Sequence, residues 1–176
     1  MSSISVKVDR DSLNISDKIM GIIEDNLVQI VQDIAQEGAT AAQAAVSTGM
    51  YAGVCRFSVE DIKSSKTHAS CNMVGTGEPV ERTWRYQGST KTVQVDPLLM
   101  SEFGSGWLAD NLWDMGGVGQ GTFPGQKHAS DPDGWYWTDV TGVEHHSIGE
   151  PPSYPMHTAD LRMIEVAPEI AKGVFR

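Results

Sequence analysis

One long amphipathic pattern, from Asn14 to about Val46, constrains the fold of this chain more than any other feature. At about 100° per residue its aliphatic side chains fall on one stripe, whereas charged residues and glutamines face the other way. The stripe is formed by Ile19, Ile23, Leu27, Ile30, Ile34, Ala41 and Ala45. The pattern predicts a helix over about 14–47, much longer than the average of about 11–12 residues in globular proteins.

The two halves of this predicted helix differ in side-chain size. Large aliphatic residues fill the first half, whereas alanine dominates residues 38–45. Small side chains suit a place where another backbone approaches closely, and they still favour a helix. One interpretation is an amphipathic helix that lies on a sheet of the same chain. The other is that Ala41 and Ala45 pack against a neighbouring subunit.

The length of the chain, 176 residues, predicts a single domain over residues 1–176 with a real hydrophobic core. No apolar run is long enough for a membrane span and no secretory signal is expected, so we expect no membrane partner. Cys55 and Cys71 are the only cysteines. Two thiols do not make a disulfide framework in a chain of this size, which favours a reducing compartment.

The formal net charge of −10 limits the partners that this chain can have. A protein that grips nucleic acid does so by neutralising phosphates with lysine and arginine, and this chain is acidic. The charge is compatible with nucleic acid that passes through an acidic channel without sticking, because a like-charged lining repels the backbone.

The remaining patterns predict short antiparallel strands and a second helix. Strands are predicted at 4–8, 51–59 and 67–74, with turns at 60–65 and 75–79 and a hairpin over 82–95 that turns near residues 87–89. Residues 98–106 are expected to be a compact apolar piece that ends in a glycine turn. A strand at 134–137 is expected to turn at 141–142 into a strand at 143–148; in a two-residue turn Trp137 would face His146, but Asp139 would face Glu144, which leaves the register open. The last helix is predicted over about 158–172, and Pro168 is expected to interrupt or end it. The predicted fold is therefore α+β: two helices, with the long N-terminal one packed on a small antiparallel sheet from about 51–106 and 134–148.

Residues 107–133 lose all periodicity and contain five glycines within ten positions, 116–125. We expect a long loop insert, and loops of this length are usually functional. Aromatic residues cluster around it: Trp107, Trp113, Phe123, Trp135, Tyr136 and Trp137. They predict either a second small core or an interface anchor, since tryptophan and tyrosine dominate buried contact centres.

Motifs for catalysis are weak in this sequence. His128, Asp131 and either His145 or His146 are the candidate ligands of a metal-dependent hydrolase. Adjacent histidines on a strand point to opposite faces, so at most one of the pair joins any site. The glycine run at 116–121 lacks the strand, helix and lysine of a phosphate-binding loop. We expect no cofactor and no metal, and a monomeric small-ligand-binding module is a third interpretation.

Several segments, taken in order, resemble a known family. They are Thr48-Gly49-Met50-Tyr51-Ala52, Ser101-Glu102-Phe103-Gly104-Ser105-Gly106, Asp131-Pro132-Asp133-Gly134-Trp135-Tyr136-Trp137 and Gly149-Glu150-Pro151-Pro152-Ser153-Tyr154-Pro155-Met156. With the long helix before them, they resemble the tail-completion or neck proteins of long-tailed bacteriophages, the head–tail joining (minor tail, lambda Z-like) family.

This resemblance implies a structural virion protein without enzymatic activity, made in the host cytoplasm and assembled into the neck or tail. It implies a homo-oligomeric ring, a hexamer or dodecamer, that contacts head-completion, tail-terminator or tail-tube proteins and lets DNA pass through its channel. The candidate interface residues are Ala41, Ala45, Glu102, Phe103, Gly104, Gly106, Trp107, Trp113, Phe123, Trp135 and Trp137.

Overall fold

The computed structural model describes residues 10–86, 89–109 and 131–174 of the chain. Its elements are α1 (Arg10–Val46), β1 (Cys55–Ser65), β2 (His68–Gly77), β3 (Val80–Tyr86), β4 (Ser89–Val95), α2 (Pro97–Phe103), β5 (Ser105–Gly106), β6 (Trp135–Thr138), β7 (Glu144–Ser147), β8 (Gly149–Glu150) and α3 (Pro155–Val174). The α+β fold with a long N-terminal helix, antiparallel strands and a short C-terminal helix is confirmed. The strand predicted at 4–8 lies outside the described residues.

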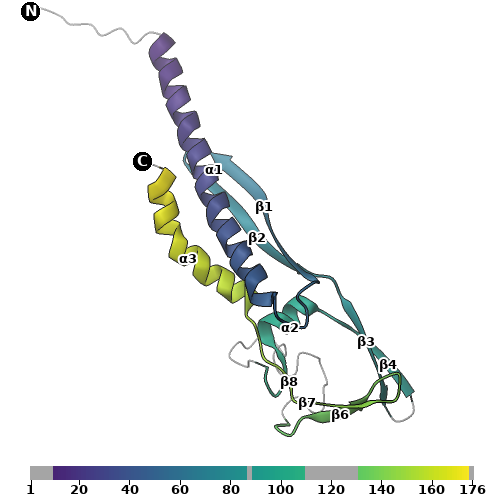
Figure 1. Cartoon of the computed structure of the whole chain (residues 1–176). Coiled ribbons are helices and arrows are strands. Elements are labelled where there is room, and N and C mark those ends of the chain that lie inside the picture. Colours follow the sequence, from purple (N-terminus) through teal and green to yellow (C-terminus); the bar gives the residue numbers. More distant parts are fainter. Residues whose placement is uncertain (1–9, 87–88, 110–130, 175–176) are drawn as a thin grey trace, which may run out of the picture.

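Helix α1 is the axis of the molecule (Figure 1). It packs against α3 and against both strands of the β1–β2 ribbon. Ser64, near the tip of the ribbon, donates a hydrogen bond to the Glu24 carboxylate (2.6 Å), so α1 extends past the ribbon from about that level to Arg10. None of the helices in the described part of the chain has the length and apolarity that crossing a bilayer requires.

The β1–β2 ribbon is longer than its sequence predicts, and the predicted turn at 60–65 is wrong. β1 continues to Ser65 across a bulge between Glu60 and Lys63. At the bulge Asp61 has a φ of 52°, and its carboxylate accepts a hydrogen bond from Asn72 (3.1 Å). Every residue of the chain from 60 to 68 is exposed, so the distal part of the ribbon lacks the alternation of apolar and polar residues that identifies a half-buried strand.

The glycines at the base of the ribbon serve close packing within β2, so the turn predicted over 75–79 is wrong for residues 75–77. β2 runs through Gly75 to Gly77. A Cβ at Gly75 would lie 2.8 Å from the sulfur of Met156, and one at Gly77 would lie 2.6 Å from the ring of Pro97. Glycine therefore lets α2 and α3 approach the strand directly.

The other strands form two further antiparallel sheets. The predicted hairpin over 82–95 is confirmed as β3 and β4, and β6 and β7 join it in the order β4-β3-β6-β7. Trp137 pairs with His145, which replaces the Trp137–His146 pairing expected from a two-residue turn. The loop is longer because Asp139 accepts hydrogen bonds from the backbone N–H groups of Thr141 (2.8 Å) and Val143 (3.0 Å). β5 and β8 form the third pair.

The described residues contain three helices, one more than predicted. The segment 98–106, expected to be a compact apolar piece, begins as α2. Asp96 caps this helix by accepting hydrogen bonds from the N–H groups of Leu98 (2.9 Å) and Leu99 (3.2 Å), and Pro97 occupies its first turn.

Helix α3 begins at Pro155, three positions before the predicted start, and it continues through Pro168 to Val174. The expectation that Pro168 interrupts or ends the helix is therefore wrong. Proline has no N–H to donate to the carbonyl of Ile164, and a missing bond of this kind bends a helix more readily than it ends one. Figure 1 shows α3 bending along its course.

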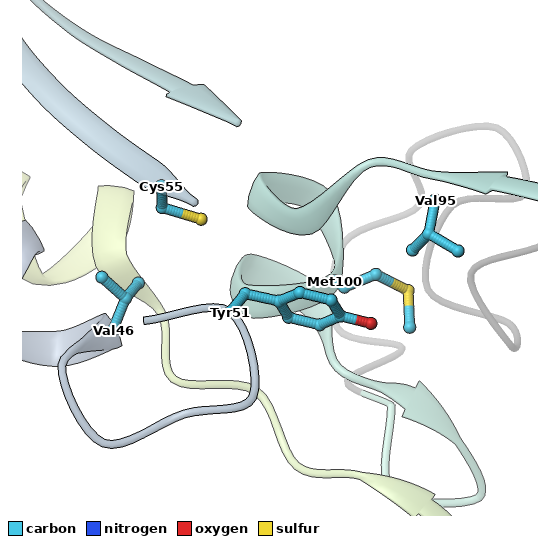
Figure 2. Close-up of a cluster of buried hydrophobic side chains, with 5 residues drawn as sticks. All are labelled: Val46, Tyr51, Cys55, Val95 and Met100. Carbon is cyan, nitrogen blue, oxygen red and sulfur yellow. The ribbon is translucent and has the colours of Figure 1, made fainter. Parts of the chain in front are cut away.

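A cluster of buried hydrophobic side chains lies where α1, the ribbon, β4 and α2 meet (Figure 2). Its members are Val46, Tyr51, Cys55, Val95 and Met100. The guanidinium of Arg82 lies 5.8 Å from the centre of the Tyr51 ring, a cation–π distance. Burial raises the pKa of the Tyr51 phenol above its ordinary value, and Arg82 opposes that shift. This cluster fixes the base of the ribbon to the end of α1.

Candidate functional site

The Glu-Phe-Gly-Ser-Gly segment joins α2 to the start of α3. The carboxylate of Glu102 accepts hydrogen bonds from the backbone N–H groups of Met156 (2.7 Å) and His157 (3.1 Å). Both groups lie in the first turn of α3, where N–H groups have no partner within the helix. Glu102 therefore caps a helix that begins more than fifty residues later in the chain, and its negative charge also suits the helix dipole.

A second set of bonds fixes the same junction through Ser101. The carbonyl oxygen of Ser101 accepts hydrogen bonds from the N–H groups of Ser153 (2.8 Å) and Tyr154 (3.2 Å). The hydroxyl of Ser101 donates a hydrogen bond to the carbonyl of Pro97 (2.8 Å). Two of the segments that carry the family resemblance, 101–106 and 149–156, therefore lie directly against each other.

Glycine is required at two positions of the segment 101–106. Gly104 has a φ of 73°, and a Cβ there would lie 2.5 Å from the carbonyl oxygen of Glu150. Gly106 has a φ of 62°, and a Cβ there would lie 2.7 Å from the ring of Trp135. Left-handed φ values and the lack of space together exclude larger residues. The motif residues thus hold the subunit together.

The structure places the candidate interface residues in several environments. Phe103, Gly104 and Gly106 are buried, and Glu102 and Trp135 are half-buried. Trp107 is 51% exposed. Trp113, Phe123 and the side chain of Trp137 lie outside the described residues. Of the aromatic group, Trp107 offers a large exposed surface to a partner.

The small residues of α1 receive the C-terminal helix of the same chain. Ala35, Gly38, Ala39 and Ala42 are buried. A Cβ added at Gly38 would lie 2.7 Å from the side chain of Met163 in α3. Ala41 and Ala45, which were predicted to face a neighbour, are half-buried beside this contact. An intramolecular helix thus uses much of the small-residue surface, and an interface role for Ala41 and Ala45 stays a prediction.

An ion pair closes the contact between α1 and α3. The guanidinium of Arg162 donates two hydrogen bonds to one oxygen of Glu37, at 2.7 Å and 3.0 Å. A third donor of the same side chain contacts Glu165 at 2.9 Å. These bonds raise the pKa of Arg162 above its ordinary value. Because the side chains are part-exposed, we assign this pair to orientation of the helices more than to stability.

The described members of the candidate hydrolase site have structural partners. Asp131 caps a turn by accepting a hydrogen bond from the N–H of Asp133 (3.0 Å). The Nε2 of His145 lies 3.0 Å from the carboxylate of Asp139, and the Nε2 of His146 lies 2.7 Å from the carbonyl of Asp133. His128 lies outside the described residues. Within those residues, no three His, Cys, Asp or Glu side chains are grouped so that they could hold a metal ion.

The Asp139 carboxylate organises the loop between β6 and β7. It accepts hydrogen bonds from the hydroxyl of Thr141 (2.6 Å), from backbone N–H groups and from His145. These donors, with the Thr141 hydroxyl and His145 contributing most, hold the pKa of Asp139 well below its ordinary value. A carboxylate with a lowered pKa is a poor general base near neutral pH, so the loop is structural.

Both cysteines lie in environments that favour the neutral thiol over the thiolate. Burial raises the pKa of both Cys55 and Cys71 above the ordinary value of a thiol. The Cys71 thiol donates a hydrogen bond to the backbone carbonyl of Val31 (3.2 Å). A raised pKa lowers the population of the thiolate, which is the nucleophilic form of cysteine.

An apolar groove of about 740 Å³ lies between α1, β2 and α3. The sequence did not predict it, because three segments far apart in the chain form its walls. Its lining residues are Val31, Ile34 and Ala35 from α1, residues 70–75 of β2, and Met156, Asp160 and Met163 from α3. Apolar grooves of this kind take small ligands or segments of protein.

Exposed aliphatic side chains mark the projecting parts of both long helices. Ile19 is 51% and Ile22 is 60% exposed on the first part of α1, beyond the tip of the ribbon. Leu161 and Ile164 are exposed one turn apart on α3. The predicted stripe of α1 is therefore only partly its buried face: Ile30 is buried, Ala41 and Ala45 are half-buried, and Ile19 is exposed.

No protein-family model, no curated protein and no solved structure matches this chain.

Proposed function

We propose that this chain is a structural protein of the bacteriophage neck or tail end, where copies form a ring that joins or completes the tail at the head–tail interface. The proposal gives the chain no enzymatic role. Its location would be the virion, after assembly in the host cytoplasm. Neighbouring head-completion, tail-terminator or tail-tube proteins would contact the ring, and DNA would pass through its channel.

The observation that carries this proposal is the amount of apolar surface that the subunit leaves uncovered. Large exposed apolar side chains lie on α1, α3 and the loops, and surface of this kind is typical of subunits that bury it against other copies.

The charge of the chain supports the channel part of the proposal. With 13 basic and 23 acidic residues, the subunit repels a nucleic-acid backbone overall. A lining of this sign lets DNA slide without the counterion release that makes binding strong. The order of the segments that resemble the neck and tail-completion family adds a second, independent support.

The two alternative functions have less support. A metal-dependent hydrolase would use His128, Asp131 and either His145 or His146. Of these, His128 lies outside the described residues, and each of the others already has a hydrogen-bond partner in a turn or strand. A small-ligand-binding module would use the apolar groove between α1, β2 and α3. The same groove also suits a segment of protein, and a subunit of a ring needs a surface that binds part of its neighbour.

Electron microscopy of the purified full-length protein tests this proposal. We expect ring-shaped particles with a central opening and six-fold or twelve-fold symmetry, unchanged after treatment with a chelator. Single small particles at micromolar concentration, together with hydrolytic activity that a chelator removes, would contradict the proposal and favour the hydrolase.

A further inference from the structure

β2 presents a free hydrogen-bonding edge to the apolar groove. Among the described strands it pairs with β1 alone. Six successive residues of β2, 70–75, line the groove. Because successive side chains of a strand point to opposite faces, an unbroken run means that the groove follows the edge of the strand. A free edge beside an apolar groove is the arrangement to which proteins add a further strand.

The walls of the groove determine what such a strand must look like. The Cys71 thiol bonds to Val31 of α1, so the odd-numbered side chains of β2 face the helix. Met156 and Met163 of α3 form the opposite wall, and methionine adapts readily to an incoming side chain. A strand added here has one face against these apolar groups and the other face in solvent. It therefore needs strict alternation of apolar and polar residues.

Residues 1–9 of this chain carry that alternation. Ile4, Val6 and Val8 alternate with Ser5 and Lys7 in the segment before α1. The three apolar residues are all aliphatic and two are valine, a residue that favours strands. Ser5 and Lys7 lie on the opposite side of this alternation, which suits the face that stays in solvent.

The length of α1 prevents the segment from reaching the groove of its own chain. Val31, the first groove residue on α1, is 21 positions after Arg10, which is about 31 Å along a helix. Val8 lies two residues from Arg10 and reaches at most about 7 Å, and Ile4 reaches about 21 Å. If this segment fills the groove, it comes from a second copy.

We propose that residues 1–9 of one copy add as a third strand to the edge of β2 in a second copy, with Ile4, Val6 and Val8 facing the groove. This inference rests on the self-association in the proposed function and gives it a contact. Donor and acceptor surfaces are different parts of the subunit, so the contact is head-to-tail. Repeated contacts of this type close into rings when the rotation between copies allows it.

Charge substitutions in the full-length protein test which side of the segment is buried. Val6→Asp places a carboxylate in the apolar groove, whereas Ser5→Asp places the same charge on the solvent side. We expect Val6→Asp to raise the dissociation constant of the assembly by about 100-fold or more, and Ser5→Asp to change it by less than about threefold. Light scattering measures the mass, and circular dichroism checks that both variants are folded. Equal loss of mass in both variants would contradict the predicted facing.

Disulfide trapping identifies the two partners directly. Ile4→Cys, Val6→Cys and Val8→Cys are made one at a time in the full-length chain, with Ser5→Cys as the control on the opposite side. Side chains directly opposite on paired strands lie about 4.5–5.5 Å apart at Cβ, near the range for a disulfide. Mild oxidation is expected to link one of the three to Cys71 of another copy, and Cys71→Ser is expected to abolish the link.

These experiments distinguish failure of the strand-addition contact from failure of the proposed ring. A ring-sized parent whose mass is unchanged by Val6→Asp, and which forms no link to Cys71, would overturn the strand-addition contact and leave the ring standing. A monomeric parent would overturn both the ring and the contact.

Discussion

Replacing Glu102 by alanine removes the cap that joins α2 to α3, and its effect follows from two bonds. The carboxylate accepts hydrogen bonds of 2.7 Å and 3.1 Å from the first-turn N–H groups of Met156 and His157. Loss of a helix cap costs about 0.5–2 kcal/mol, and loss of a favourable charge at the N-terminus of a helix adds about 0.3–1 kcal/mol. Because Glu102 is half-buried and bonds two donors, we expect Glu102→Ala to lower the free energy of unfolding by about 2 kcal/mol.

For a chain of this size, about 2 kcal/mol corresponds to a fall in Tm of about 4–8 °C. Thermal unfolding followed by circular dichroism, at equal protein concentrations, measures it. Glu102→Gln keeps one acceptor and should fall between the parent and alanine. Glu169→Ala is the matched control: Glu169 pairs with Lys172 on the exposed side of α3, and we expect a change below about 0.5 kcal/mol. If Glu102→Ala unfolds at the same temperature as Glu169→Ala, the cap does not hold the junction.

Three further predictions concern single positions in the described fold. Gly149→Ala would place a Cβ against a carbonyl of the neighbouring strand and should lower the free energy of unfolding by more than about 3 kcal/mol. Gly142 has a similar φ but open space around it, so Gly142→Ala should lower the free energy of unfolding, measured with denaturant, by about 1–2 kcal/mol. Gly38→Leu overpacks the contact between α1 and α3 and should lower the free energy of unfolding by about 1–3 kcal/mol. Gly21→Ala lies in an open part of the same helix and should raise the free energy of unfolding by about 0.5–1 kcal/mol. A lower free energy of unfolding in both variants would contradict this packing. Because the pKa of Asp139 is lowered in the folded protein, the Asp139 carboxylate stabilises the fold at pH values above 3.8, its ordinary pKa, and this stabilisation is lost as the pH falls further. The free energies of unfolding of the parent and of Asp139→Asn should therefore differ near neutral pH and converge in acid. A constant difference down to pH about 2 would refute this.

Elements with strong periodicity were predictable from the sequence. α1 and the β3–β4 hairpin lie close to their predicted ranges. One side of α1 is buried and sets a clear period, whereas in the hairpin the signal is the alternation that ends in Val93 and Val95 of β4. The start of α2 also has a local signal, since Asp96-Pro97 is a cap followed by a proline in the first turn. This cap predicts a helix from residue 97, whereas the apolar residues of 98–106 alone indicate only a compact apolar piece.

The distal ribbon and the junction were not predictable from local patterns. Residues 60–65 are exposed on every side, so no alternation distinguishes the strand from a turn. The bond from Glu102 to α3 joins positions more than fifty residues apart, and nothing near Glu102 in the sequence indicates its partner. The groove has the same origin, because its walls come from three elements that only the fold brings together.

The mass of the purified full-length protein in solution tests most directly whether this chain forms a ring. A subunit of 19.1 kDa predicts about 115 kDa for six copies and about 229 kDa for twelve. Native mass spectrometry resolves these values without ambiguity between neighbouring copy numbers. The account predicts one of these two species as the main form at micromolar concentration. A single peak at the mass of one chain, unchanged as concentration rises, would contradict it.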